Sequence, residues 1–343
     1  MINKINYFKI KKYKNERNKF YNHKIFVKCI LICINFFINY HNYSNIDYFN
    51  LNFTQNKKEY FLYRFSIIQR TECPNCGFFS FYIVHLGCIK KCLSMGYIPI
   101  IDLKSFPNAY NKGNTSIMNP WEFFFIQPYN YTLEEVKLYA KNIKYYKCTG
   151  KENRPREKKI YYNKNSIFFW HNFEEKFMPL KKEIIEESNS IMKQLFGNST
   201  NILGVKVRGT DYISLKLKGH SIQPKIEKVI LDVKMMDEKN KYDFIFFATE
   251  DEIIKKKFIP EFGDKLKVLN PKIKINYNYN NTYMINLNEN IYGNIEYIRN
   301  YVLNTIILSK CLDIITSRCS GATGIFILTN GFRNTKIYNL GEY

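Results

Sequence analysis

Residues 202–207, Ile202-Leu203-Gly204-Val205-Lys206-Val207, run directly into the segment Arg208-Gly209-Thr210-Asp211. The first six residues form a short, mostly apolar run, which predicts a buried strand. The four that follow are small or polar and include a glycine, which predicts a turn. In open parallel sheets, ligands bind beyond the carboxyl ends of the strands. This stretch therefore predicts an α/β fold with a ligand site at the end of this strand.

Further strands and helices alternate on both sides of this stretch. Upstream, a strand, a loop with Pro74 and Gly77, a helix and a second strand follow one another, which is the βαβ unit of a parallel sheet. Strands are expected at 60–68, 97–102, 202–207, 244–248, 313–316 and 336–339, with Val268-Leu269 completing the pattern. Helices are expected at 78–95, 133–142, 174–195, 225–236, 295–310 and 321–328.

The chain has 343 residues and is 45% hydrophobic, which is enough for two packed domains of ordinary size. We expect two Rossmann-like α/β domains, over residues 59–198 and 199–343, with a cleft between them. Residues 1–58 differ from the rest because they are rich in Asn, Lys and Tyr and contain no Pro or Gly. They are interpreted as an extension that the fold does not require.

The formal net charge of +22 suggests an anionic partner, such as nucleic acid, a membrane surface or a phosphorylated substrate. Residues 1–58 hold eleven Lys/Arg against two Asp/Glu, and a second basic cluster lies at 151–159. Much of the lysine excess accompanies an abundance of Asn, Ile and Tyr, so compositional drift explains it as well. The apolar run 29–40 is too short to span a membrane, which requires about 20 residues. A signal-anchor or interfacial helix, with peripheral membrane contact, is the alternative to a poorly ordered extension.

The nine cysteines are odd in number and scattered, which favours a reducing compartment over a disulfide framework. A cytoplasmic protein with free buried or loop thiols is therefore expected, located in solution or at the inner face of the membrane. Cys73, Cys76, Cys88 and Cys92 could surround a zinc ion with four thiolates. The spacing of Cys88 and Cys92 within a helical pattern argues against it, and no metal site is predicted.

Three polar clusters follow predicted strands of the second domain, at 208–211, 249–251 and 317–324. The Arg208 guanidinium offers several donors and stays charged, which suits a diphosphate. Gly209 lets the backbone approach an anion closely. Ser320 and Gly321 open a helix and can present free N–H groups to phosphate. Together these features fit a nucleotide-sugar site, in which fixed positive charge stabilises the departing nucleoside diphosphate without a metal.

Each cluster also has a purely structural interpretation. The turn after Arg208 can be a salt-bridged loop, and small residues at a helix start can serve packing alone. Thr249-Glu250-Asp251 forms a good helix N-cap with acidic residues in the first turn. His85 is expected to pack on its helix, and Trp121 fits the core better than a sugar platform.

The order of these motifs resembles the α-1,6-fucosyltransferases, nodulation fucosyltransferases and protein O-fucosyltransferases. The segment Gly204 to Asp211 is similar to their His-Val-Arg-Arg-Thr-Asp stretch, and Gly219-His220-Ser221-Ile222 to their His-Pro-Ile element. Phe247 to Asp251 and Cys311 to Ser320 resemble two further strand ends of this family. Gly96 to Asp102 and Asn119 to Glu122 resemble bacterial members that make surface polysaccharide. The resemblance covers residues 60–343 and is strongest in the second domain.

The resemblance implies a GT-B fold, GDP-fucose as the donor, inversion of the anomeric centre and no metal or other cofactor. It implies that Arg208 holds the donor β-phosphate, and Asp211 is a guess for the catalytic base. The implied donor-binding residues are Arg208, Gly209, His220, Glu250, Asp251, Asn304, Ser320 and Gly321.

Four positions depart from the family pattern. Lys206 replaces a histidine, and Glu250 replaces an aspartate. Asn304 replaces an aspartate that reads guanine, so guanine preference is less secure than phosphate binding. Lys216 stands where a candidate glutamate base lies, which leaves the base open.

The sequence thus predicts an inverting, metal-independent glycosyltransferase that moves a sugar, fucose from GDP-fucose, to a glycan acceptor in surface polysaccharide or glycoconjugate synthesis. The partners are a nucleotide-sugar and a glycan, with no nucleic acid. The alternatives are a transferase for another nucleotide-sugar and a non-catalytic basic module that binds nucleic acid or an acidic polymer. The basic module would bind tightly and with strong salt dependence through residues 1–58 and 151–159.

Overall fold

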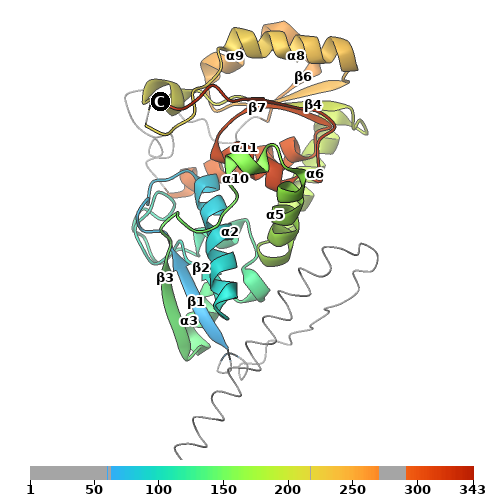
Figure 1. The fold of residues 1–343 in the computed structure, drawn as a ribbon. Coiled ribbons are helices and arrows are strands. Elements are labelled where there is room, and N and C mark those ends of the chain that lie inside the picture. Colours follow the sequence, from blue (N-terminus) through green and yellow to red (C-terminus); the bar gives the residue numbers. More distant parts are fainter. Residues whose placement is uncertain (1–59, 61–62, 217, 270–290) are drawn as a thin grey trace, which may run out of the picture.

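The computed structural model describes residue 60 and residues 63–216, 218–269 and 291–343 (Figure 1). The basic extension 1–58, with its apolar run 29–40, lies outside these residues. Within the described part of the chain, no helix is both long and apolar enough to cross a membrane.

The first sheet has three parallel strands in the order β2-β1-β3. Its central strand, β1 (Arg64–Gln69), has four consecutive buried residues, as expected for a strand covered on both faces. Helix α2 (Phe78–Ser94) connects it to β2 (Ile98–Ile101), which confirms the predicted βαβ unit. The third strand, β3 (Asn142–Lys147), was not predicted, because its residues are polar and mostly exposed at the sheet edge.

The second sheet has five strands in the order β6-β5-β4-β7-β8, and all neighbouring pairs are parallel. The strands are β4 (Ile202–Lys206), β5 (Phe244–Ala248), β6 (Leu266–Lys267), β7 (Asp313–Ser317) and β8 (Thr335–Tyr338). The chain moves outward from β4 through β5 to β6 and then returns to the other side of β4. The topological switch point therefore lies between β4 and β7, where ligands of such sheets bind.

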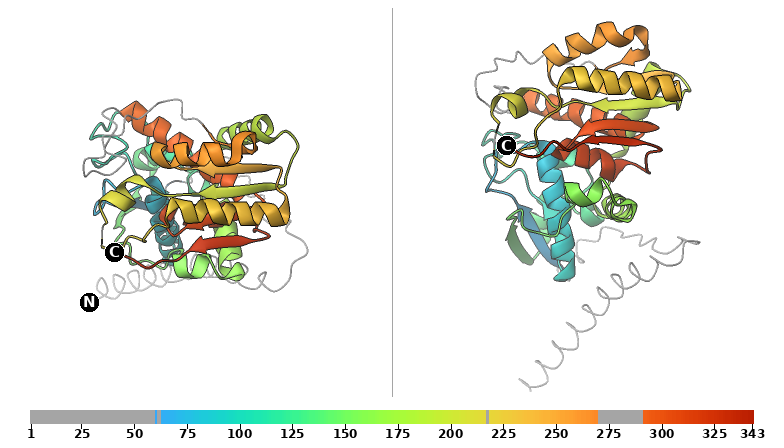
Figure 2. Two further views of the ribbon diagram at one scale, coloured as in Figure 1. Left: turned by 90° about the horizontal axis from the view of Figure 1, so that it is seen from above. Right: turned by 45° about the horizontal axis from the view of Figure 1, so that its top comes forward.

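Alternate residues of β4 contribute to the cores on the two faces of this sheet. Leu203 and Val205 pack with α8 (Ile226–Asn240) and α9 (Glu252–Phe262), which cover one face (Figures 1 and 2). On the other face lie α10 (Ile291–Ser309) and α11 (Ser320–Leu328). A β-carbon at Gly204 would lie 2.8 Å from the Ile314 side chain and 3.1 Å from the Cys311 sulfur, so glycine permits this close packing.

The helices of the first sheet pack directly against those of the second. A β-carbon added at Gly324 of α11 would lie 2.4 Å from the Phe79 ring of α2, which shows how closely these helices approach. One hydrophobic cluster includes α2, α10, α11 and residues of both sheets. The predicted boundary between residues 198 and 199 therefore falls beside a shared core, and the division into domains stays a prediction.

The single helix predicted over 174–195 is wrong. Two helices occupy this region, α5 (Lys164–Phe177) and α6 (Lys182–Phe196), and Pro179 lies between them. Proline lacks the N–H that a continuous helix requires, so the helix is interrupted there. Helix α9 was also missed, although its N-cap at Asp251 was recognised as a structural alternative.

Shorter elements complete the described fold. Helix α3 (Leu133–Tyr139) starts with a capping box formed by Thr132 and Glu135. The remaining short helices are η2 (Pro120–Phe123), η3 (Pro128–Asn130), α4 (Glu157–Ile160), α7 (Thr210–Ser214) and η4 (Gly263–Lys265).

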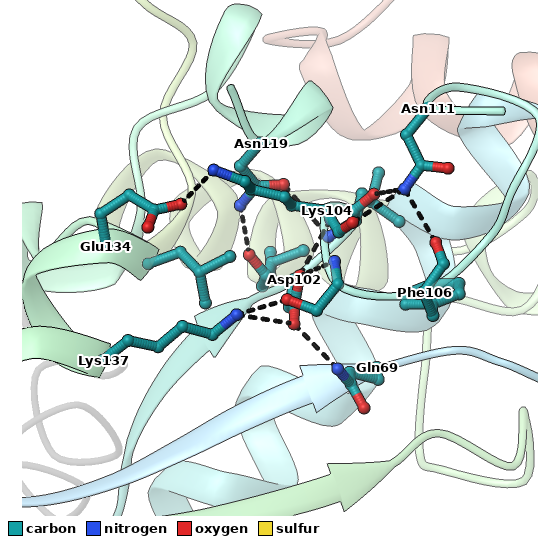
Figure 3. Close-up of polar contacts among 12 residues, drawn as sticks. Gln69, Asp102, Lys104, Phe106, Asn111, Asn119, Glu134 and Lys137 are labelled. Carbon is teal, nitrogen blue, oxygen red and sulfur yellow. Dashed lines mark hydrogen bonds and ion pairs between the residues drawn. The ribbon is translucent and has the colours of Figure 1, made fainter. Parts of the chain in front are cut away.

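The carboxyl end of β2 is closed by polar side chains (Figure 3). Asp102 is fully buried, and its Oδ1 accepts bonds of 2.9 Å from the amides of Lys104 and Ser105. Its Oδ2 accepts a 2.8 Å bond from Gln69 and lies 3.8 Å from the Lys137 ammonium. Protein groups thus satisfy this carboxylate, so its role is to fix the loop after β2.

The expectation of free thiols is wrong for four cysteines. The structure pairs Cys73 with Cys76 and Cys88 with Cys148, which joins α2 to the end of β3. The spacing of 60 residues between the second pair gave no signal in the sequence. The four cysteines weighed for zinc are not gathered as one set, and the described residues contain no group of three or more His, Cys, Asp or Glu suited to a metal.

Candidate functional site

The three polar clusters predicted from the sequence lie at the carboxyl ends of β4, β5 and β7, which are the three inner strands of the second sheet. Lys206, the last residue of β4, is in register with Ala248 of β5 on one side and Thr316 of β7 on the other. The segments that follow these three strands therefore leave the sheet side by side. Their meeting point is the β4/β7 switch point.

Arg208 is fixed by Glu250 rather than left free. Its Nη1 lies 3.2 Å from Glu250 Oε1, and the same oxygen accepts a 2.9 Å hydrogen bond from the Gly209 amide. Burial alone raises the pKa of Glu250, but Arg208, Lys206 and the Gly209 amide together hold it below its ordinary value. Glu250 is therefore a carboxylate that orients the guanidinium, which matches the salt-bridged alternative for this turn.

Gly209 is required by the close approach of two segments. A β-carbon at this position would lie 2.4 Å from Asp251 Oδ2 and 2.7 Å from Asp251 Cβ. Asp251 cannot move away freely, because its Oδ1 caps α9 by accepting from the amides of Ile253 and Ile254 at 2.9 and 3.2 Å. The N-cap interpretation of Asp251 is thus confirmed, and its assignment to the donor pocket stays a prediction.

Ser320 and Gly321 form the first turn of α11, as predicted. The N-cap residue Cys319 accepts from the Ala322 amide with its sulfur at 3.3 Å and from the Thr323 amide with its carbonyl oxygen at 3.0 Å. The amides of Ser320 and Gly321 are therefore the ones that an anion could use. A β-carbon at Gly321 would collide with the Tyr301 hydroxyl, at 2.1 Å, so a larger residue is excluded there.

His220 reaches the site through an aromatic contact. The Arg208 guanidinium carbon lies 4.9 Å from the centre of the Tyr212 ring, and the Tyr212 and His220 ring centres are 4.9 Å apart. The His220 carbonyl oxygen accepts a 3.0 Å bond from the Tyr343 amide, which places the end of the chain beside this segment. The stacking of Tyr212 with Arg208 and His220 has no signature in the sequence.

Asn304 lies on α10 and donates a 2.8 Å hydrogen bond to the carbonyl oxygen of Asn300 in the preceding turn. It is three residues beyond Tyr301 and therefore on the same side of the helix. Asp211 belongs to α7, and its role as a base stays a prediction. Lys216 still stands where the family has a candidate glutamate base.

Two further charged residues are buried near the strand ends, Lys206 and Arg318. Lys206, which replaces a histidine of the family pattern, is 4% exposed, and its ammonium lies 4.8 Å from the centre of the Tyr301 ring. Arg318 is also buried and donates to Asn339 at 2.9 Å and to Glu342 at 2.8 Å. Arg318 therefore fastens the C-terminal segment against β7.

The aromatic candidates of the first half belong to the core, as predicted. His85 is fully buried, and its ring centre lies 5.0 Å from that of Trp121 and 5.6 Å from that of Phe81. Burial, aided by Arg70, lowers the pKa of His85 to about 3, so this histidine is neutral. Trp121 is itself fully buried and stacks on Phe125 at 4.7 Å.

No protein-family model and no curated protein matches this chain. A solved structure of NodZ alpha-1,6-fucosyltransferase co-crystallised with GDP is similar at 12% identity and TM-score 0.47, covering 78% of this chain and 93% of that one. Fucosyltransferase NodZ from Bradyrhizobium gives 13% identity and TM-score 0.47, with 78% and 92% covered. POFUT1 in complex with GDP-fucose gives 6% identity and TM-score 0.39, with 80% and 73% covered. These proteins are of the kind that the motifs resemble, but likenesses this weak carry no argument about function, which has to come from the site.

Proposed function

We propose that the chain is an inverting, metal-independent glycosyltransferase that transfers fucose from GDP-fucose to a glycan acceptor. The observation that carries the proposal is the convergence of Arg208 and the first turn of α11 at the β4/β7 switch point. A half-buried arginine and open helix amides at the same end of the sheet form an arrangement suited to phosphate.

In this proposal the diphosphate lies between the end of β4 and the start of α11. Glu250 holds Arg208 in one orientation, so the guanidinium is in place before the donor binds. As the bond between fucose and the β-phosphate of GDP breaks, negative charge accumulates on the departing GDP. Fixed donors at this point stabilise that charge without reorganising.

The other parts of the reaction are less closely tied to the geometry. The acceptor glycan is proposed to bind on the side of the first sheet, and Asp211 is retained as the proposed base. Asn304 can offer one acceptor oxygen and one N–H group to the base of the nucleotide, whereas a carboxylate would accept two bonds from guanine. Phosphate recognition is thus better supported than guanine recognition.

The direct test is Arg208→Ala in a transfer or donor-hydrolysis assay with GDP-fucose. We expect turnover to fall by about 10²- to 10³-fold, the typical effect of removing one donor that stabilises transition-state charge. Arg299→Ala is the control. Arg299 lies on α10, pairs with Glu187 of α6 at 2.6 Å and has no proposed role in the site. Turnover of Arg208→Ala at the wild-type level would contradict the phosphate assignment.

A thermal-shift panel of GDP-, UDP- and CMP-sugars, with GDP alone, decides between donors. Stabilisation by GDP and GDP-fucose is expected, and a response to UDP- or CMP-sugars alone would support a different transferase. A basic binding module would instead respond to nucleic acid in a salt-sensitive manner and be indifferent to Arg208→Ala.

A further inference from the structure

Lys206 is a buried lysine at the centre of the proposed site. It ends the central strand β4 and lies in register between Ala248 and Thr316, and only 4% of it is exposed. Removing an ammonium from water is costly unless an opposite charge or several acceptors compensate. The surroundings of Lys206 therefore indicate what it serves.

The protein itself offers Lys206 only weak compensation. Its ammonium lies 4.8 Å from the centre of the Tyr301 ring, a cation–π contact. Among the residues that the structure describes, no carboxylate oxygen lies within 4 Å of Nζ. The carboxylate of Glu250 is engaged instead by Arg208 at 3.2 Å and by the Gly209 amide at 2.9 Å.

The side chain of Lys206 lies against the first turn of α11. A β-carbon at Gly321 would lie 3.0 Å from Lys206 Cε and 2.1 Å from the Tyr301 hydroxyl. Glycine at this position thus lets the lysine stem, the tyrosine ring and the first turn of α11 occupy one small region. The same turn supplies the amides assigned above to the diphosphate.

We infer that Lys206 is the second cation of the donor site and that its ammonium binds the diphosphate of the nucleotide-sugar together with Arg208. The inference rests on the proposed function and deepens it, since it names a second cation whose ammonium has no carboxylate oxygen within 4 Å among the described residues. Bound diphosphate would add to the counter-charge of Glu250, whose carboxylate is paired with Arg208 at 3.2 Å. Gly321 and Tyr301 then act by positioning the ammonium.

The titration of Lys206 gives the inference a specific signature. Burial lowers its pKa, Cys319 and Glu250 oppose this, and Arg208 adds to it. The fourth group that faces it, the Tyr301 hydroxyl, has its own pKa raised well above the ordinary value by burial and stays neutral. As the pH rises, the Lys206 ammonium should lose its proton, and the donor affinity should decline. This decline should begin at a lower pH than for a lysine with the ordinary pKa of about 10.4.

The experiment measures binding of GDP-fucose to the full chain by calorimetry, from about pH 7 to about pH 10. We expect Lys206→Met to weaken binding by about 10- to 100-fold, the typical effect of losing one charged hydrogen bond. Lys206→Arg should retain most of the affinity and lose less of it at high pH, because arginine does not titrate there. Any titration of the guanine itself affects the wild type and the Lys206→Arg variant equally.

Lys90→Met is the matched control, because Lys90 also lies over aromatic rings, 4.7 Å from Phe169, but on α2 away from the sheet end. Its affinity for GDP-fucose should equal that of the wild type. Lys206→Met should remain folded, since replacing an uncompensated buried charge by an apolar side chain is commonly neutral or stabilising. A melting temperature equal to or above that of the ligand-free wild type supports the inference.

Two results would overturn the inference, and they differ in meaning. If Lys206→Met binds GDP-fucose as the wild type does while Arg208→Ala does not, Lys206 has only a structural role and the proposed function stands. If the wild type itself binds no nucleotide-sugar, the proposed function fails and the inference fails with it.

Discussion

At the scale of single residues, the site depends on direct contacts between the turn that follows β4 and the segment that follows β5. Glu250 contacts both the Arg208 guanidinium and the Gly209 amide, so the turn after β4 is tied to the end of β5. Gly209 is the point of closest approach, since a β-carbon there would lie 2.7 Å from Asp251 Cβ. The glycine was predicted to serve contact with an anion, and the structure gives it a packing role as well.

Gly209→Ala tests this contact. The added methyl group must push Asp251 or the turn away, so we expect the free energy of unfolding to fall by about 1–3 kcal/mol, as in other overpacked sites. Affinity for GDP-fucose should fall by about tenfold or more because Arg208 moves with the turn. Urea denaturation and calorimetry measure the two effects.

Gly77→Ala serves as the control for this substitution. No atom lies within 4 Å of a β-carbon built at Gly77, and its φ of −60° suits alanine. Only the cost of an alanine N-cap is expected, about 1 kcal/mol at most, with unchanged affinity for the nucleotide-sugar. Equal behaviour of the two alanine variants would show that the Gly209 contact is unimportant.

At the scale of secondary-structure elements, helix α9 shows how a site residue can have a structural task. Asp251 caps this helix with one carboxylate oxygen and is 7% exposed. Its own amide donates a 3.1 Å bond to Thr249 Oγ1. The two assignments of Asp251 can therefore be separated by the choice of substitution.

Asp251→Asn keeps an oxygen that can cap α9, whereas Asp251→Ala removes it. We expect Asp251→Ala to lower the free energy of unfolding by about 1 kcal/mol and Asp251→Asn to stay close to the wild type. If Asp251 also acts on the donor, both variants lose affinity for GDP-fucose. Wild-type affinity of a folded Asp251→Asn protein would remove Asp251 from the donor pocket.

At the scale of the whole molecule, the two sheets are joined by a common core. Helix α11 follows β7 of the second sheet, yet its Gly324 packs on Phe79 of α2 from the first. The Tyr161 hydroxyl donates a 3.1 Å bond to the Cys319 carbonyl oxygen across the same junction. Separating residues 59–198 from 199–343 would expose this apolar surface.

We therefore expect one cooperative thermal transition for the full chain in scanning calorimetry. A fragment of residues 199–343 should fail to give a cooperative transition, because the faces of α10 and α11 that contact α2 and α5 lose their cover. A fragment of residues 59–343 is the control and should melt as the full chain does. Two resolved transitions, or a stable 199–343 fragment, would instead support independent domains.

The sequence by itself determined the parallel α/β fold and the strand ends that carry the polar clusters. Buried strands and their glycine turns leave strong local signals, so β1, β2, β4, β5 and β7 were predictable. The edge strand β3 and the break between α5 and α6 were not, because exposed polar strands lack periodicity and one apolar pattern can extend over two helices.

Only the tertiary structure decided how the site is built. The salt bridge between Arg208 and Glu250 and the disulfide between Cys88 and Cys148 join residues that are far apart in the chain. The burial of Lys206 beside Tyr301 depends on where α10 crosses the sheet. Sequence patterns report which face of an element is apolar, whereas the distances between charged groups follow from how the elements pack. For this reason the strand ends were predictable, and the role of Lys206 was not.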